Sequence, residues 1–119
     1  MNYARDEVSI IMSRLSAEVQ LLAQHQATLC KIFSSPQRVL ILWFLAEKEH
    51  TVSEIAGALG ASLPSTSQHL RVMELNSILE SHREKQNIFY SLAKNDLLQS
   101  CLVLANLPKE ELTQIESGI

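Results

Sequence analysis

Apolar residues recur every three or four positions along the first third of the chain. This spacing keeps one helix face apolar and predicts a single amphipathic helix over residues 3–33. Such a stripe is longer than the core of a small protein requires, so we expect part of it to pack against a second copy of the chain. The stripe consists of Val8, Ile11, Met12, Leu15, Val19, Leu22, Leu29, Ile32 and Phe33.

A second and almost wholly apolar helix is predicted to begin at Pro36. Proline suits the first turn of a helix, because its missing N–H would be unpaired there anyway. The polar stretch 47–50 is predicted to be a link, with His50 in solvent. The helix itself is the expected centre of the core through Val39, Leu40, Leu42, Trp43, Phe44 and Leu45.

Two short helices joined by a tight turn are predicted over residues 51–76. Residues 51–54 (TVSE) match a capping box, in which Thr51 accepts an orphan backbone donor and Glu54 reaches back. The turn is Gly60-Ala61, and Ser62 is the expected N-cap of the second helix. Helical geometry gives this second helix a buried face of Thr66, Leu70 and Met73, an outward face of Ser65, Gln68 and Arg71, and flanks of Ser67 and His69.

A hairpin and a last helix complete the predicted order. Residues 78–83 and 87–92 have the composition of strands, joined by residues 84–86, and form a β-wing over 78–92. A helix-turn-helix followed by such a wing presents one helix to the major groove of DNA. A final helix begins near Asn95 or Asp96, and Pro108 opens a short acidic tail. This helix is expected to bury Leu97, Leu98, Cys101, Leu102, Leu104 and Ala105.

The expected fold class is mainly α (α+β). We interpret residues 1–119 as one winged-helix domain, with 1–33 and 95–119 as dimerisation helices. Hydrophobic residues make up 46% and charged residues 19% of the chain, which favours a folded domain. The longest apolar run, residues 39–46, is too short to cross a bilayer, so we expect a cytoplasmic protein without a membrane partner.

Charge is distributed unevenly along the chain. The net charge is −3. Residues 62–94 carry four basic and three acidic side chains, a net of +1, whereas residues 95–119 carry one basic and four acidic side chains, a net of −3. The least negative segment is therefore the one predicted to touch phosphate. Because its excess is small, nonspecific affinity for DNA should be modest and strongly salt-dependent.

Four ordered segments resemble the ArsR/SmtB family of bacterial repressors. They are residues 33–42 (FSSPQRVLIL), 52–56 (VSEIA), 67–70 (SQHL) and 89–92 (FYSL), and the resemblance covers roughly residues 28–92. It implies a homodimeric winged helix-turn-helix repressor that binds an inverted repeat in double-stranded DNA and is released by an inducer. It also implies that Ser65, Ser67, Gln68 and His69 face the operator, and that Arg83 supports the wing.

Side-chain chemistry agrees with part of this assignment. A glutamine amide such as that of Gln68 can pair with adenine through two hydrogen bonds, and basic side chains suit phosphate. His82 either touches phosphate or faces water. The family commonly has glycine where Ser77 and Lys85 stand, so the wing turn is expected to differ. The predicted DNA-binding set is Ser62, Ser65, Ser67, Gln68, His69, Arg71, Arg83 and Lys85.

Two cysteines, Cys30 and Cys101, are the candidate sensors. The family's Cys-rich metal motif is absent from residues 52–59 (VSEIAGAL), and the last helix has Asp96 but no histidine, so no metal site is predicted. Both cysteines lie on predicted dimerisation helices. They could serve a redox or persulfide switch, or hold a thiophilic metal or metalloid. The alternative is that each simply fills space, since free cysteine is among the most buried residue types. We therefore predict no cofactor.

Other functions remain open in the sequence. A winged-helix dimer could bind a protein instead of DNA, and the low basic charge is the best support for that alternative. A constitutive regulator without a ligand is a second one. An enzyme is not expected, because the sequence shows no nucleophile–base set, no carboxylate pair at a defensible site and no phosphate-binding glycine loop.

Overall fold

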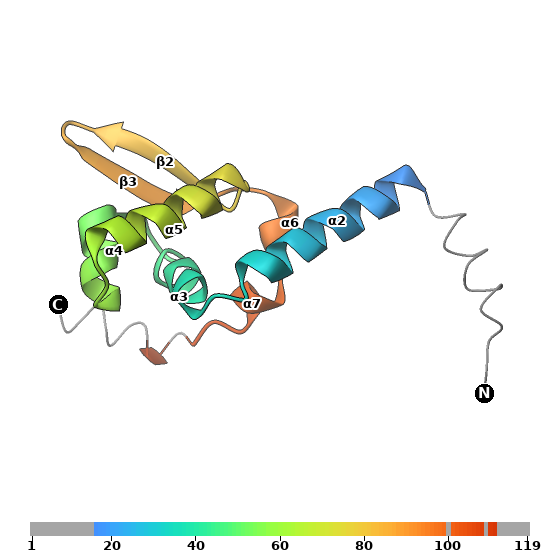
Figure 1. The fold of residues 1–119 in the computed structure, drawn as a ribbon, viewed down its shortest axis with the longest axis horizontal. Coiled ribbons are helices and arrows are strands. Elements are labelled where there is room, and N and C mark those ends of the chain that lie inside the picture. Colours follow the sequence, from blue (N-terminus) through green and yellow to red (C-terminus); the bar gives the residue numbers. More distant parts are fainter. Residues whose placement is uncertain (1–15, 100, 109, 112–119) are drawn as a thin grey trace. The chain divides into compact units, whose positions relative to one another are not determined.

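The computed structural model describes residues 16–99, 101–108 and 110–111 (Figure 1). The chain divides into two compact units, residues 1–31 and 32–119. Helix α2 (Ala17–Ile32), which lies in the first unit except for its last residue, confirms the C-terminal half of the predicted helix, while residues 3–15 lie outside the described part. Three apolar side chains of α2 are about half exposed: Val19 at 45%, Leu21 at 51% and Leu22 at 50%.

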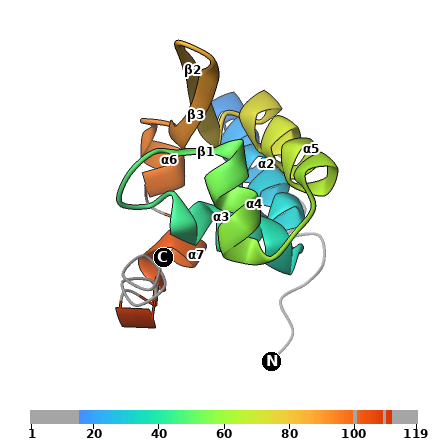
Figure 2. The ribbon, with the colours of Figure 1, turned by 90° about the vertical axis from the view of Figure 1, so that its left-hand side faces the viewer.

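The second unit combines short helices with a three-stranded antiparallel sheet of order β1-β3-β2. The predicted helix-turn-helix and the hairpin after it are confirmed, and the hairpin projects from the helices in both views (Figures 1 and 2). Among the described residues, no helix is long and apolar enough to span a membrane. The elements are α3 (Pro36–Phe44), β1 (His50–Thr51), α4 (Val52–Leu59), α5 (Leu63–Leu75), β2 (Leu79–Glu84), β3 (Asn87–Leu92), α6 (Asp96–Gln99) and α7 (Leu102–Ala105).

Hydroxyl side chains cap the N-termini of helices α3, α4 and α5. The N-cap of α3 is Ser35, whose Oγ accepts the backbone N–H of Arg38. Thr51 and Glu54 form the predicted capping box of α4. Ser62 caps α5, accepting the N–H of Ser65 at 3.2 Å. Each cap satisfies a donor that the first helical turn leaves unpaired, so local sequence alone places these three helix starts.

The core of the second unit lies where α3, α4 and α5 meet β2. As predicted, the central helix α3 supplies much of it, and Thr66, Leu70 and Met73 of α5 are buried. The predicted core placement of Leu40 was wrong, because its side chain is 38% exposed while the next two residues of α3 are fully buried. The large hydrophobic side chains with less than 2% exposure are Ile41, Leu42, Leu45, Ile55, Leu70, Met73, Ile78 and Leu98.

A strand begins at the last residue of the predicted polar link after α3, and the placement of His50 in solvent was wrong. His50 pairs with Tyr90 as part of β1, is only 5% exposed, and stacks on Phe44 with ring centroids 4.1 Å apart. A two-residue strand has no periodicity that a sequence could reveal, and its partner strand lies some 40 positions further along.

The predicted last helix is broken into α6 and α7. Leu98 and Cys101 are buried as expected, but Leu102 is 77% exposed and Ala105 is also exposed, so their predicted burial was wrong. Cys101, which lies between the two helices, has an extended backbone and caps α7. The apolar spacing alone could not show this restart.

Trp43 connects α3 to α7. Its indole Nε1 donates a hydrogen bond of 2.8 Å to the carbonyl of Val103 in α7, and its ring is half-buried. A helix of four residues leaves all of its carbonyls without partners inside the helix, so an external donor is favourable there. The predicted core role of Trp43 therefore includes a tie between α3 and α7.

The two positions where the family commonly has glycine keep a left-handed backbone. Ser77 has φ of 61° and Lys85 has φ of 58°. The wing turn consists of Lys85 and Gln86, one residue shorter than predicted, because Glu84 pairs with Asn87. The wing therefore turns tightly without glycine. It does so against the crowding between Cβ and the carbonyl that disfavours left-handed backbone in other residues.

Ser77→Gly should stabilise the fold by about 0.5–1 kcal/mol. Relief of the left-handed strain, roughly 1–2 kcal/mol, exceeds the entropy that an added glycine gains in the unfolded chain. The backbone bonds of Ser77, one donated to Glu74 and one accepted from Asn95, do not need its side chain. Urea denaturation measures the change. The matched control is Ser53→Gly, in helix α4, which should destabilise. A Ser77→Gly variant as unstable as this control would contradict the argument.

Candidate nucleic-acid interface

Helix α5 has one buried and one polar face. Thr66, Leu70 and Met73 hold the helix against the core. The predicted outward residues Ser65, Gln68 and Arg71 are exposed, and so is Ser67. The helix thus offers hydroxyl, amide and guanidinium groups to solvent from a rigid support.

The turn between α4 and α5 sets the angle at which α5 leaves the core. Gly60 caps α4 with φ of 63° and ψ of 32°, and the N–H of Ala61 donates to the carbonyl of Ala56 at 3.0 Å. A Cβ at Gly60 would meet nothing within 4 Å, so the backbone conformation, rather than space, requires glycine here.

The capping box of α4 should make stability depend on pH. The backbone N–H of Thr51, which donates to Glu54 Oε1 at 2.9 Å, is the main cause that holds the pKa of Glu54 below 4.5. Because the pKa of Glu54 is lower in the folded state, its carboxylate adds stability above about pH 4.5. That stability is lost as the pH falls through the pKa of the folded state.

Glu54→Gln should therefore be less stable than the wild type at pH 7, with the difference shrinking toward pH 3. Urea denaturation across this range measures it at a fixed protein concentration. Glu80→Gln, an exposed carboxylate on β2, is the control and should follow the wild type at every pH. A gap between Glu54→Gln and the wild type that stays constant with pH would rule out the titration.

His69 is turned partly inward and has a partner inside the protein. It is half-buried, and its Nδ1 lies 3.5 Å from Nη1 of Arg38. Burial, and then the charge of Arg38, lower the pKa of His69. A neutral ring that accepts from Arg38 carries its proton on Nε2, which leaves one donor available to a ligand.

Arg38 connects α5 to the residues before α3. Its Nε donates to the carbonyl of Ile32 at 2.8 Å while its Nη1 faces His69. This role could not be predicted from the sequence, because nothing local relates position 38 to position 69. Arg38 therefore positions His69 relative to the start of α3.

The wing presents two basic side chains. Arg83 on β2 and Lys85 in the turn are both exposed. Ser81, on the same strand face as Arg83, donates a hydrogen bond of 2.5 Å from its Oγ to Glu74 Oε2, which ties β2 to α5. Burial, followed by the negative charge of Glu74, raises the pKa of Tyr90, the partner of Ser81 across the sheet. The wing is thus held beside α5.

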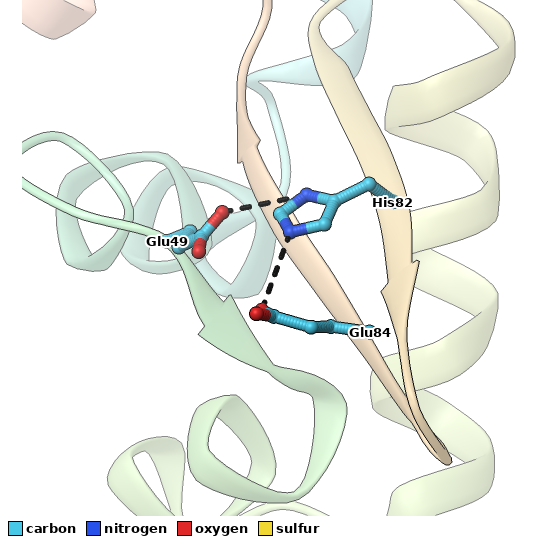
Figure 3. A group of neighbouring side chains, drawn as sticks. All are labelled: Glu49, His82 and Glu84. Carbon is cyan, nitrogen blue, oxygen red and sulfur yellow. Dashed lines mark ion pairs between the residues drawn. The ribbon is translucent and has the colours of Figure 1, made fainter.

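The opposite face of β2 carries a cluster that the sequence did not predict. His82 lies between two carboxylates, with its Nδ1 3.4 Å from Glu49 Oε2 and its Nε2 3.9 Å from Glu84 Oε2 (Figure 3). All three side chains are exposed. Glu84 could have been paired with His82 from strand alternation, whereas Glu49 had no local signal.

The two candidate sensor thiols differ in their surroundings. Both cysteines are free, with Cys30 exposed on α2 and Cys101 buried. The Sγ of Cys101 accepts the N–H of Leu104 at 3.4 Å and so caps α7. This bond gives Cys101 a structural role that packing alone would not require.

Comparisons with known proteins give consistent results. The family model described as "Bacterial regulatory protein, arsR family" matches residues 35–76. The HTH-type transcriptional regulator YgaV of Escherichia coli is 36% identical over 87 residues, which cover 72% of this chain and 87% of that protein. The biofilm growth-associated repressor of Xylella fastidiosa (strain 9a5c) is 33% identical over 94 residues, covering 79% and 81%.

A solved structure shares the arrangement of elements. It is the homodimeric winged helix-turn-helix DNA-binding domain Mb0332 from Mycobacterium bovis, described as a possible ArsR-family regulator. Its TM-score is 0.64 at 26% identity, over 87% of this chain and 88% of that one. Sequence and structure comparisons therefore agree with each other over most of the chain.

Proposed function

The chain belongs to the ArsR family of bacterial regulatory proteins, and on that premise we propose that it is a homodimeric repressor that binds an inverted-repeat operator. One observation carries the proposal most directly. Helix α5 turns Ser65, Gln68 and Arg71 to solvent while its opposite face is fixed in the core. A polar helix face on a rigid support is what reading base edges in the major groove requires.

The proposed contacts divide by chemistry. Gln68 reads an adenine, and the hydroxyls of Ser65 and Ser67 contact bases or phosphate. Arg71, Arg83 and Lys85 contact phosphate. Two further groups already have a partner within the protein: the Oγ of Ser62, which caps α5 and still has its hydroxyl proton to donate, and His69, which would act through its Nε2.

The dimer supplies the second recognition helix. The half-exposed Val19, Leu21 and Leu22 of α2 support an apolar contact between subunits, and the structurally similar Mb0332 domain is homodimeric. Symmetry would place the two α5 helices about one turn of DNA apart, roughly 34 Å, which matches the two halves of an inverted repeat.

A salt titration tests the proposed function. Duplexes that the chain binds are first selected from a random library, and affinity is then measured by fluorescence anisotropy as salt increases. If the three basic residues contact phosphate in both subunits, six contacts predict a slope of log K against log salt of about −5. Failure to select or bind any duplex at low salt would instead favour a winged-helix dimer that binds a protein.

The proposed release signal is thiol chemistry at Cys30 and Cys101. The exposed Cys30 thiol supports it, because an oxidant or a thiophilic ion can reach that sulfur directly. The capping bond of Cys101 supports a packing role for that residue instead.

Replacing both cysteines with serine should distinguish a sensing role of the thiols from a packing role. If the thiols sense, diamide or arsenite should release DNA from the wild type but leave the Cys30→Ser/Cys101→Ser complex intact, as followed by anisotropy. The control is salt-induced release, which should be the same for both proteins. If the double variant still releases DNA on oxidation, neither cysteine is the sensor and both are packing residues.

A further inference from the structure

The cluster of Glu49, His82 and Glu84 joins parts of the sheet that are far apart in sequence. Glu49 directly precedes β1, and the other two side chains project from β2 (Figure 3). Strand β3 lies between these strands in the sheet. The three side chains therefore bridge the two outer strands across the central one.

The donor atoms suit a divalent transition-metal ion. Each of the three residues offers one ligand atom, and these three atoms lie within 4.8 Å of one another. Ligands of a tetrahedral ion with bonds of 2.0–2.2 Å are about 3.3–3.6 Å apart. Glu49 faces Nδ1 and Glu84 faces Nε2 of His82, and one ion can bind only one of these nitrogens. Because the side chains of Glu49 and Glu84 are 42% and 66% exposed, rotation of the two carboxylates can bring both to the same nitrogen without moving the ring.

The imidazole is also held in place by packing. His82 stacks on Phe89 with ring centroids 5.5 Å apart and an angle of 16° between the planes. Phe89 is the partner of His82 across the sheet, so the backbone register fixes the stack. A ligand ring that is already oriented loses less entropy when it binds a metal.

We propose that Glu49, His82 and Glu84 form a binding site for a zinc-class divalent ion on the wing. One imidazole nitrogen with two carboxylates favours Zn²⁺, Ni²⁺ or Co²⁺ over Mg²⁺ and Ca²⁺, which prefer all-oxygen sites. With the imidazole neutral, the two carboxylates give the cluster a charge of −2, which a divalent ion cancels.

Occupancy of the site should strengthen DNA binding, a consequence that rests on the proposed function. The two carboxylates place a charge of −2 close to Lys85, and this charge repels DNA phosphate from the wing. A bound divalent ion cancels the charge and so removes the repulsion. The ion also links β2 to the loop before β1, which restrains the hairpin before DNA arrives. It would therefore act in the direction opposite to an inducer.

Metal binding by the purified full chain is tested first, without DNA. Zn²⁺ is titrated by calorimetry and Co²⁺ by visible absorption, in which thiolate ligands would add a charge-transfer band that this site lacks. Glu49→Gln, Glu84→Gln and His82→Asn should each weaken binding at least about 10-fold. Glu80→Gln, an exposed carboxylate on the same face of β2, should stay within about twofold of the wild type. Equal Zn²⁺ affinity in wild type and cluster variants would overturn the site.

DNA affinity with and without Zn²⁺ is tested second. Zn²⁺ should tighten binding of the selected duplex at least about threefold in the wild type and in Glu80→Gln, but not in Glu49→Gln, with Mg²⁺ as the inactive ion. Because Glu80→Gln also removes one negative charge, it separates metal binding from charge alone. Metal binding with unchanged DNA affinity would overturn the coupling, whereas absence of DNA binding under every condition would count against the proposed function and leave the metal titration valid.

Discussion

Leu70→Ala should lower the free energy of unfolding by about 2–5 kcal/mol. Leu70 is fully buried on the inner side of α5, where the helix contacts the core. Truncation removes the transfer free energy of the side chain and leaves a cavity that close-packed neighbours fill only in part. A small domain has only about 5–15 kcal/mol of stability, so this single change should remove a large share of it.

Urea denaturation at several protein concentrations measures the loss, because the stability of a dimer depends on concentration. Leu75→Ala is the matched control. It makes the same change on the same helix, but its side chain is 71% exposed, so the expected effect is within about 0.5 kcal/mol. Equal losses in the two variants would show that α5 does not pack as described.

Gln68→Ala should weaken operator binding by about 1–3 kcal/mol, or roughly 5- to 150-fold, while leaving stability nearly unchanged. The Gln68 side chain is exposed, so its removal leaves the core intact, and the loss would come from the two hydrogen bonds to a base. Selectivity at one base step in each half-site should relax at the same time. Anisotropy measurements on the selected duplex and on duplexes substituted at single positions give both quantities.

The salt dependence distinguishes base contacts from phosphate contacts. Gln68→Ala should leave the slope of log K against log salt unchanged, whereas Arg71→Ala should make it shallower by about one for each phosphate that the arginine no longer neutralises. Gln99→Ala, an exposed glutamine on α6, is the control for removal of an amide and should bind like the wild type. Unchanged affinity in Gln68→Ala would exclude this residue from the groove.

Features with short-range causes could be predicted from the sequence. The caps at Ser35, Thr51 and Ser62 satisfy donors only three residues away, so the residue order itself locates the starts of three helices. Helical periodicity separated the buried Leu70 from the exposed Gln68 for the same reason. The winged helix-turn-helix and the polar face of α5 could therefore be predicted from residue order alone.

Features that depend on distant contacts were missed or predicted wrongly. From the sequence His50 was predicted to be a polar loop residue. In the structure its backbone pairs with β3 and its ring stacks on Phe44. The last helix looks continuous until Cys101 restarts it and Trp43 binds a carbonyl of α7. For the strand at His50 and for the tie from Trp43, the deciding partner lies some 40 or more positions away, where no local pattern reports it.

The residue order by itself determined which segments become helices and which face of α5 stays polar, because capping and amphipathicity act within a turn or two of backbone. Only the tertiary structure decided which side chains meet across the sheet and between helices. The Arg38–His69 contact and the cluster around His82 exist because packing of the core brings residues 31 and 33 positions apart to within 4 Å of each other. Hydrophobic burial drives that packing without regard to direction or sequence distance, so the polar groups it brings together at the surface can be read only from the folded chain.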